Sequence, residues 1–166
     1  MKKVVLSALM LIGLVLNAQG QDLSKNAIGL RLGSNDGFGA EISYQRALSQ
    51  KNRVEIDLGW RSSTAYDAVK VAGVYQWVWE IQDGFNWYAG AGGGLASWSW
   101  DAPAGYSGKN SGTTLFVAGN VGVEYNFDIP LQVSLDMRPE LYFGENNYRT
   151  NNFGPDLALS VRYKFN

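Results

Sequence analysis

Two carboxylates in the stretch RVEIDLGWR are the residues best suited to acid–base chemistry. Glu55 and Asp57 lie two positions apart, so in a β-strand their side chains share one face. Such a pair can act as acid and base. The alternative is structural, with each carboxylate paired in a buried polar core to an arginine such as Arg31, Arg53 or Arg61. We favour the structural interpretation, because similar charges recur along the whole chain.

Other kinds of reactive site lack the residues they need. The 166 residues contain no histidine and no cysteine, which excludes His-dependent nucleophilic catalysis and zinc sites of the usual ligand types. The GAGGG run, Gly90–Gly94, lacks the Lys-Ser/Thr and the helix of a phosphate loop. The loop acids Asp67, Asp101 and Glu145 lack EF-hand spacing. We therefore expect a non-enzyme with no catalytic residue, no cofactor and no metal site.

The elements that carry these side chains are β-strands. In the last ten residues, LALSVRYKFN, apolar or aromatic residues alternate with Ala, Ser, Arg and Lys, which is the period of a strand. The same alternation predicts eight strands, near residues 27–33, 38–46, 53–61, 69–80, 86–98, 114–125, 131–143 and 153–165. Glycine and alanine fill both faces of 86–98, where Trp87, Ala89, Ala91, Gly93 and Leu95 are assigned to the apolar face. Pro139 lacks a backbone N–H, so we expect a bulge or a strand end there.

The first twenty residues have the organisation of a secretory signal peptide, with an N-terminal anchor helix as the alternative. Lys2 and Lys3 precede an apolar run that is short for a membrane span, and Ala18 and Gly20 are small residues at the −3 and −1 positions of a cleavage site. We expect cleavage after Gly20, or after Ala18, which leaves one domain of residues 21–166. Cleavage removes two lysines and no acid, so the formal charge changes from −1 to −3 and provides no basic surface for nucleic acid.

The remaining question is which strand face meets water. Aromatic side chains gather near the strand ends of the apolar face, as at a membrane interface, and short turns alternate with longer loops. The sequence therefore predicts an all-β, eight-stranded antiparallel up-and-down transmembrane β-barrel with its polar face inside. The predicted aromatic girdle comprises Tyr44, Trp60, Trp77, Trp79, Trp87, Tyr125, Phe143, Tyr163 and Phe165.

An eight-stranded barrel is just wide enough for side chains to fill its interior. We expect a lumen charge network of Arg31, Glu41, Glu55, Asp57, Arg61, Glu124, Asp136, Arg138, Glu140, Arg162 and Lys164. Buried charges need partners, and neighbouring strands supply them. For Arg162 and Lys164 the expected partners are Asp136, Glu140 and Glu41.

With its signal peptide, eight amphipathic strands and terminal Tyr163-Lys164-Phe165, the chain resembles the small OmpA/OmpX-like outer-membrane β-barrel proteins of Gram-negative bacteria. The glycine-rich chain ending in R-Y-x-F particularly resembles the outer membrane β-barrel domain proteins of Bacteroidetes. The resemblance covers residues 27–165 and implies insertion into the outer membrane by the barrel assembly machinery. In that family a C-terminal aromatic residue helps the machinery recognise its client. Phe165 matches, although Asn166 follows it.

The resemblance and the residues together lead to a non-enzymatic, monomeric outer-membrane protein with a structural or surface-interaction role. Its contacts would be membrane lipid, lipopolysaccharide and a partner of the loops near 98–112 and 144–152. Trp98, Trp100 and Tyr106 are candidate loop contacts, although Trp98 and Trp100 equally suit an interfacial anchor. A narrow porin-like channel is one alternative, with Gly92, Gly94, Ala118 and Gly122 leaving a path. A soluble lipocalin-like carrier of an apolar ligand is the other.

Overall fold

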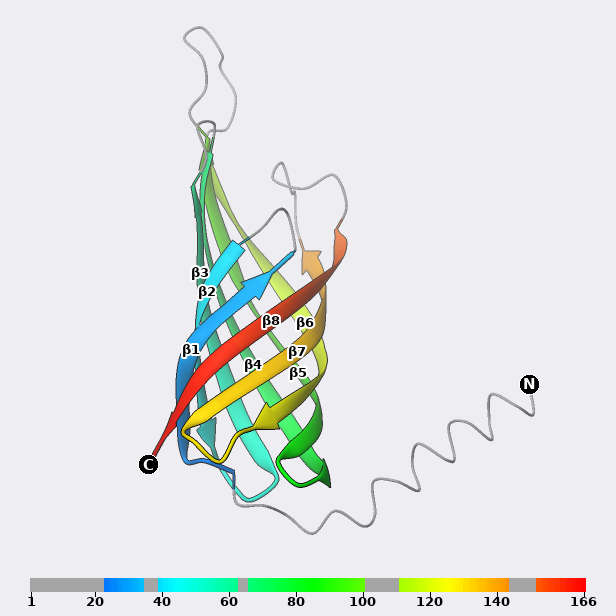
Figure 1. The fold of residues 1–166 in the computed structure, drawn as a ribbon. Helices are drawn as coiled ribbons and strands as arrows, with labels where there is room; N and C mark the ends of the chain where they lie inside the picture. The colour runs from blue at the N-terminus through cyan, green and yellow to red at the C-terminus, as the bar shows by residue number, and fades with distance from the viewer. Residues whose placement is uncertain (1–22, 35–38, 63–65, 101–110, 144–151) are drawn as a thin grey trace, which may run out of the picture.

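The computed structural model describes residues 23–34, 39–62, 66–100, 111–143 and 152–166. These residues form eight antiparallel strands in a closed barrel, each strand paired with its neighbours in the chain (Figure 1). The strands are β1 (Asn26–Gly33), β2 (Gly39–Ala47), β3 (Asn52–Ser62), β4 (Tyr66–Gln82), β5 (Phe85–Trp100), β6 (Ser111–Asn126), β7 (Leu131–Phe143) and β8 (Phe153–Phe165). The expected all-β fold of eight antiparallel strands is confirmed.

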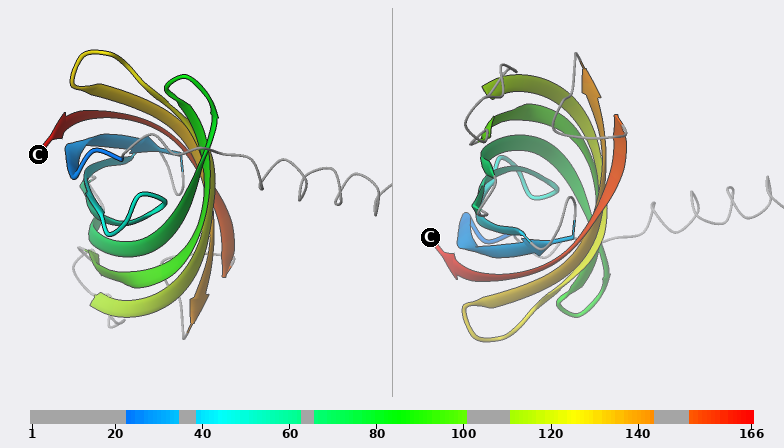
Figure 2. Two further views of the ribbon diagram at one scale, coloured as in Figure 1. Left: turned by 90° about the horizontal axis from the view of Figure 1, so that it is seen from below. Right: turned by 90° about the horizontal axis from the view of Figure 1, so that it is seen from above.

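The barrel closes where its first and last strands meet. Leu30 of β1 lies opposite Val161 of β8, and the pairing continues through the whole of β1. Figure 2 looks along the barrel and shows the strands completing a ring. Closure leaves no unpaired sheet edge around the wall, which a barrel in a membrane requires.

The two ends of the barrel differ. At one end, called here the turn end, β1 begins, β8 finishes and three short turns join β2 to β3, β4 to β5 and β6 to β7 (Figure 1). Asp83 and Gly84 make the tightest of these turns, and Gly84 has a φ of 75°, which glycine adopts without strain. The connections at the other end, the loop end, are residues 35–38, 63–65, 101–110 and 144–151, which lie outside the described residues. The strands β4, β5 and β6 are the longest and rise highest toward the loop end.

Strand alternation sorts the side chains into two faces of opposite character. Charged and amide side chains point into the lumen, where Arg31, Arg138 and Arg162 are almost completely buried. Large apolar side chains point outward along every strand, including Leu30, Ile42, Leu58, Val71, Leu95, Val117, Leu135 and Leu159. A water-soluble barrel would reverse this arrangement, because its apolar side chains would fill the core. In the described part of the chain, no helix is long and apolar enough to cross a membrane.

The outer face of the described strands carries charge only near its two ends. Asp67 lies near the loop-end tip of β4, and Arg46 lies near the turn-end tip of β2. Between the height of Asp67 and the height of Arg46 along the barrel, the outward-facing side chains are apolar, aromatic, small or hydroxylated. The described surface therefore presents an uncharged belt around the barrel.

Pro139 does not produce the expected bulge or strand end. It is an interior residue of β7, and the β6–β7 register is the same on both sides of it, from Ala118↔Glu140 to Val121↔Met137. Only the pairs between these two are missing from the ladder. Proline removes one backbone donor, and the flanking pairs keep the strand in place.

Candidate functional site

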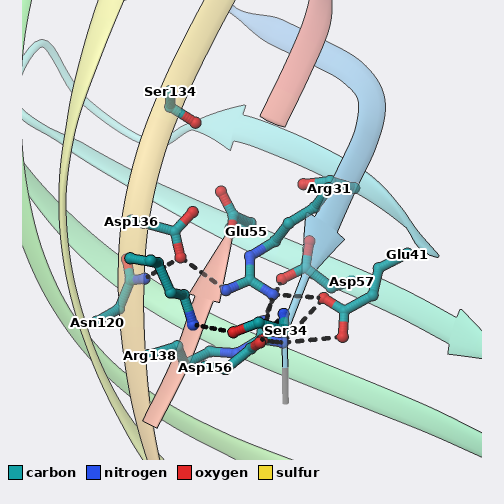
Figure 3. A network of polar contacts seen from close by, with 12 residues as sticks. Arg31, Ser34, Glu41, Glu55, Asp57, Asn120, Ser134, Asp136, Arg138 and Asp156 are labelled. Atoms are coloured by element: carbon teal, nitrogen blue, oxygen red, sulfur yellow. Dashed lines mark hydrogen bonds and ion pairs between the residues drawn. The ribbon is translucent and has the colours of Figure 1, made fainter. Parts of the chain in front are cut away.

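The lumen is the most distinctive site of the barrel, and Figure 3 shows its carboxylates gathered around the buried Arg31 of β1. One nitrogen of its guanidinium, Nη1, contacts Glu41 Oε2 at 2.9 Å and Asp156 Oδ2 at 2.7 Å. The other, Nη2, contacts Asp136 Oδ1 at 2.7 Å. The three carboxylates come from β2, β8 and β7, so one arginine connects four strands.

A second arginine, Arg138 of β7, extends this network. Its Nη1 lies 2.6 Å from Asp57 Oδ2, and its Nη2 lies 2.8 Å from Glu41 Oε2. Its Nε lies 3.0 Å from Glu140 Oε1, which also accepts a 2.6 Å hydrogen bond from Lys70 Nζ. Glu41 therefore bridges both arginines. The planar guanidinium carries its donors in a fixed fork, which suits it to contact several carboxylates in a defined geometry.

Arg162 of β8 forms a separate cluster closer to the turn end. Its Nη2 contacts Glu55 Oε2 at 3.0 Å, and it donates hydrogen bonds to the hydroxyl oxygens of Ser43 at 3.0 Å and Ser134 at 2.8 Å. Gln45 donates to the same oxygen of Glu55 at 2.5 Å. Arg162 is thus held by three other strands.

The expected partners of the last two cations are wrong. The carboxylates of Asp136, Glu140 and Glu41 bind the arginines of β1 and β7, or Lys70, instead of Arg162 and Lys164. Lys164 donates a 2.9 Å hydrogen bond to the Phe127 carbonyl oxygen at the turn end. Pairing depends on how far each side chain reaches across the lumen, which strand adjacency does not predict.

Three further lumen charges, Arg53, Lys70 and Asp156, join the network beyond the members predicted from the sequence, and Arg53 was expected there only as a possible partner of Glu55 or Asp57. Arg53 lies 2.6 Å from Glu124 Oε2, donates to Gln76 Oε1 at 2.5 Å, and sits 4.8 Å from the centroid of the Tyr88 ring. All three obey the same period of two as the predicted members. The alternation by itself places them on the polar face. The side chain of Arg61, which was predicted, lies outside the described part of the structure.

The arrangement neutralises charge and offers little for catalysis. Glu55 and Asp57 share a face, yet Glu55 pairs with Arg162 and Asp57 with Arg138, so neither carboxylate stands ready as a free acid or base. Among the described residues, no group of three or more Asp or Glu side chains is placed to hold a metal ion.

Ring side chains occupy the space beside the small inward residues. A Cβ added to Gly94 would clash with the Val71 carbonyl oxygen and lie 2.7 Å from Phe116 Cζ, and one added to Gly122 would lie 2.6 Å from the Tyr88 hydroxyl oxygen. The Phe116 ring packs in turn on Tyr142, with centroids 5.0 Å apart. These glycines therefore make room for lumen rings instead of leaving an open path beside them.

The predicted girdle residues lie on the outer face, mostly toward the turn end. Trp79 and Trp87 stack with ring centroids 4.4 Å apart, and Tyr163 and Phe165 stack at 6.4 Å. Tyr44, Trp77 and Tyr125 share this end, whereas Trp60 and Phe143 lie toward the loop end. Both positions suit the interfaces of a membrane, where aromatic rings are enriched.

The candidate loop contacts need a correction. Trp98 belongs to β5 and points into the barrel, where it is only 8% exposed and packs over Gly112. It is a wall residue and not a loop contact, because β5 and β6 remain paired beyond it. The backbone of Trp100 ends β5, and its side chain lies outside the described part, as do Tyr106, the predicted signal peptide and most of both predicted loops.

Comparison with known proteins agrees with this geometry. No family model matches the chain, and no curated protein is similar to it in sequence. Among solved structures it resembles the N-terminal β-barrel domain of Pseudomonas aeruginosa OprF, with a TM-score of 0.63, 15% identity, and coverage of 89% of this chain and 100% of that one.

Two further solved structures resemble the chain. Neisserial surface protein A has a TM-score of 0.62 and 20% identity, with 84% of this chain and 94% of that one covered. Ail, the attachment invasion locus protein of Yersinia pestis, has a TM-score of 0.51 and 16% identity, with 86% and 97% covered. The fold is that of the eight-stranded outer-membrane β-barrels. At these identities the likeness establishes the fold alone.

Proposed function

We propose that this protein is inserted in a bacterial outer membrane as a non-enzymatic, monomeric barrel that presents the segments at its loop end to the cell exterior. The role is structural or one of surface interaction. The observation that carries the proposal is the uncharged outer belt around a lumen whose charges pair with one another. An uncharged outer belt can lie against lipid, and the lumen charges need no solvent because they pair with one another.

The surroundings of the barrel follow from this placement. Acyl chains cover the apolar belt, and the aromatic girdle lies at the interface beside the turn end. Lipopolysaccharide surrounds the loop end, and the barrel assembly machinery inserts the chain. Membership of the Bacteroidetes barrel family is part of the same proposal and rests on the R-Y-x-F ending.

The two alternative functions fit this geometry less well. A soluble carrier of an apolar ligand needs its apolar face inside, whereas here that face is outside. A porin-like channel needs a continuous path, whereas Arg138 of β7 reaches across the lumen to Asp57 of β3, the strand opposite it in the ring. We expect no steady single-channel current from the protein in planar bilayers. A reproducible conductance would favour the channel.

Membrane insertion is tested on carbonate-washed membranes and by gel mobility in SDS. The folded barrel should stay with the membrane pellet and migrate faster unheated than boiled. A protein that is released by carbonate and shows one mobility would contradict the proposal.

Orientation is tested with an epitope tag placed at either end. A tag between Lys109 and Asn110, in the connection from β5 to β6, should be labelled on intact cells. A matched tag between Ser49 and Gln50, in a turn at the opposite end, should be labelled only after permeabilisation. The reverse pattern would refute the orientation and with it the surface role.

A further inference from the structure

Arg46 of β2 is an exposed cation on the outer face of the barrel, near the turn end. It lies two residues beyond Tyr44 of the aromatic girdle and two residues before Leu48, whose aliphatic side chain is also exposed. Tyr44 and Arg46 share the outward face, because side chains alternate along a strand. The guanidinium therefore lies at the lower edge of the apolar belt, between an interfacial ring and an aliphatic side chain.

A neutral side chain positions this guanidinium. The buried Asn26 of β1 accepts two hydrogen bonds at its Oδ1, from Arg46 Nη1 at 3.1 Å and from the Tyr44 hydroxyl at 2.7 Å. These two donors occupy both lone pairs of the amide oxygen. An amide oxygen can orient a guanidinium in this way, but it cannot neutralise its charge.

The charge of Arg46 has no counter-ion among the described residues. The hydrogen bond to Asn26 is its one polar contact with that part of the chain, so its Nε and Nη2 groups are available to a partner outside the barrel. Because Arg46 is exposed on the face that meets lipid, such a partner can reach it.

The surroundings of Arg46 are basic. Lys25 lies beside it, since its carbonyl oxygen accepts from the Ala47 N–H at 3.0 Å, and Lys51 belongs to the turn that follows β2. Both lysines are exposed. Within residues 23–34 and 42–56 the single acid is Glu55, which is buried in the lumen. This sector of the turn end therefore attracts anions.

Apolar side chains line the belt directly above Arg46. Tyr44 lies opposite Ile28 of β1 and Ile56 of β3, and both isoleucines are exposed on the outer face. Arg46 itself lies opposite Val54. An acyl chain can follow these side chains toward the middle of the belt while its headgroup stays beside Arg46.

We propose that Arg46 binds the phosphate of an anionic phospholipid, whose acyl chains lie against the belt above it. Arginine and phosphate form paired, charge-assisted hydrogen bonds, so the phosphate supplies the counter-ion that the chain itself does not. A glycerol headgroup leaves the net negative charge that Lys25 and Lys51 attract, whereas a choline headgroup adds a cation that they repel. The inference rests on the proposed membrane insertion and identifies one lipid contact within it.

The test uses the folded protein in micelles of an uncharged detergent, with the soluble short-chain lipid dihexanoyl-phosphatidylglycerol as the probe. NMR of the Arg46 Nε–H and of the Asn26 side-chain NH₂ should show a saturable shift. Inorganic phosphate, which lacks acyl chains, and dihexanoylglycerol, which lacks the phosphate, should each bind at least about fivefold more weakly. A shift that does not saturate, or equal binding of either comparison compound, would overturn the proposal.

Matched variants separate Arg46 from a general charge effect, with the Asn26 NH₂ as the reporter. Arg46→Gln should weaken lipid binding about three- to fivefold, which is the range expected for an exposed ion pair. Lys164→Gln removes the same charge from the same end, but this lysine lines a cavity of the lumen and should leave binding unchanged. Equal binding by Arg46→Gln and the unaltered protein, or equal losses in the two variants, would overturn the proposal.

Two further measurements keep this test apart from that of the proposed function. Faster gel mobility before heating confirms that each variant is folded. Because binding is measured in micelles, its failure would leave membrane insertion standing, and carbonate extraction tests insertion separately.

Discussion

Replacing Arg138 by methionine should destabilise the barrel by leaving one buried carboxylate without its partner. Arg138 contacts four carboxylates, but three of them have other cations: Arg31 reaches Glu41 and Asp156, and Lys70 reaches Glu140. Asp57 has its described ion pair with Arg138 alone. Breaking a buried pair in this way costs about 3–5 kcal/mol, and we expect that loss for R138M.

The double variant R138M/D57N tests the reason for the loss. If the unpaired charge of Asp57 is the main cost, replacing it with the isosteric amide should restore part of the stability. The double variant should then be more stable than R138M alone, by about 1.5–3 kcal/mol. This reversal is specific to the charge and would not follow from a cavity left by the arginine.

Urea unfolding in phospholipid vesicles, followed by tryptophan fluorescence, measures these differences. The control is Arg46→Met, which removes an exposed arginine from the outer face and should change stability by less than about 1 kcal/mol. An R138M variant as stable as this control would refute the reasoning. So would a double variant no more stable than R138M.

Three further predictions test lumen packing and the assignment of the two faces. Gly122→Ala should cost about 1–3 kcal/mol in urea unfolding, because its Cβ would lie 2.6 Å from ring atoms of the neighbouring tyrosine. Gly73→Ala, whose Cβ would meet nothing within 4 Å, should be neutral. Leu159→Arg, in the middle of the outer belt, should cost about 2–4 kcal/mol in the same vesicles, and an unchanged unfolding midpoint would argue against lipid at that face. In single-tryptophan variants, lipids with brominated acyl chains should quench the 51% exposed Trp60 strongly and the lumen-facing Trp98 weakly, and equal quenching would contradict the face assignment.

The strands and their two faces were open to prediction because they follow from local periodicity. In β8 the alternation of Leu157, Leu159 and Val161 with Ser160 and Arg162 is complete in the sequence and is retained in the structure. Even the glycine-rich β5 follows it, with Leu95 outward and Ala96 inward. A period of two requires no knowledge of distant residues.

Strand ends were less predictable, because they depend on tertiary pairing. Trp98 was expected near a loop, yet β5 and β6 stay paired as far as Ser99 and Ser111. Pro139 was expected to disturb its strand, yet the flanking pairs on both sides preserve the register. In both cases hydrogen bonds to neighbouring strands outweigh a local signal.

By itself, the sequence determined that this chain forms eight amphipathic strands with charge on one face, because alternation is encoded residue by residue. The tertiary structure decided which charges meet. Arg31 and Asp136 are 105 residues apart, and Arg138 and Asp57 are 81 apart, yet each pair lies within 2.7 Å. Barrel closure and strand tilt bring them across the lumen, and side-chain length then selects the partner.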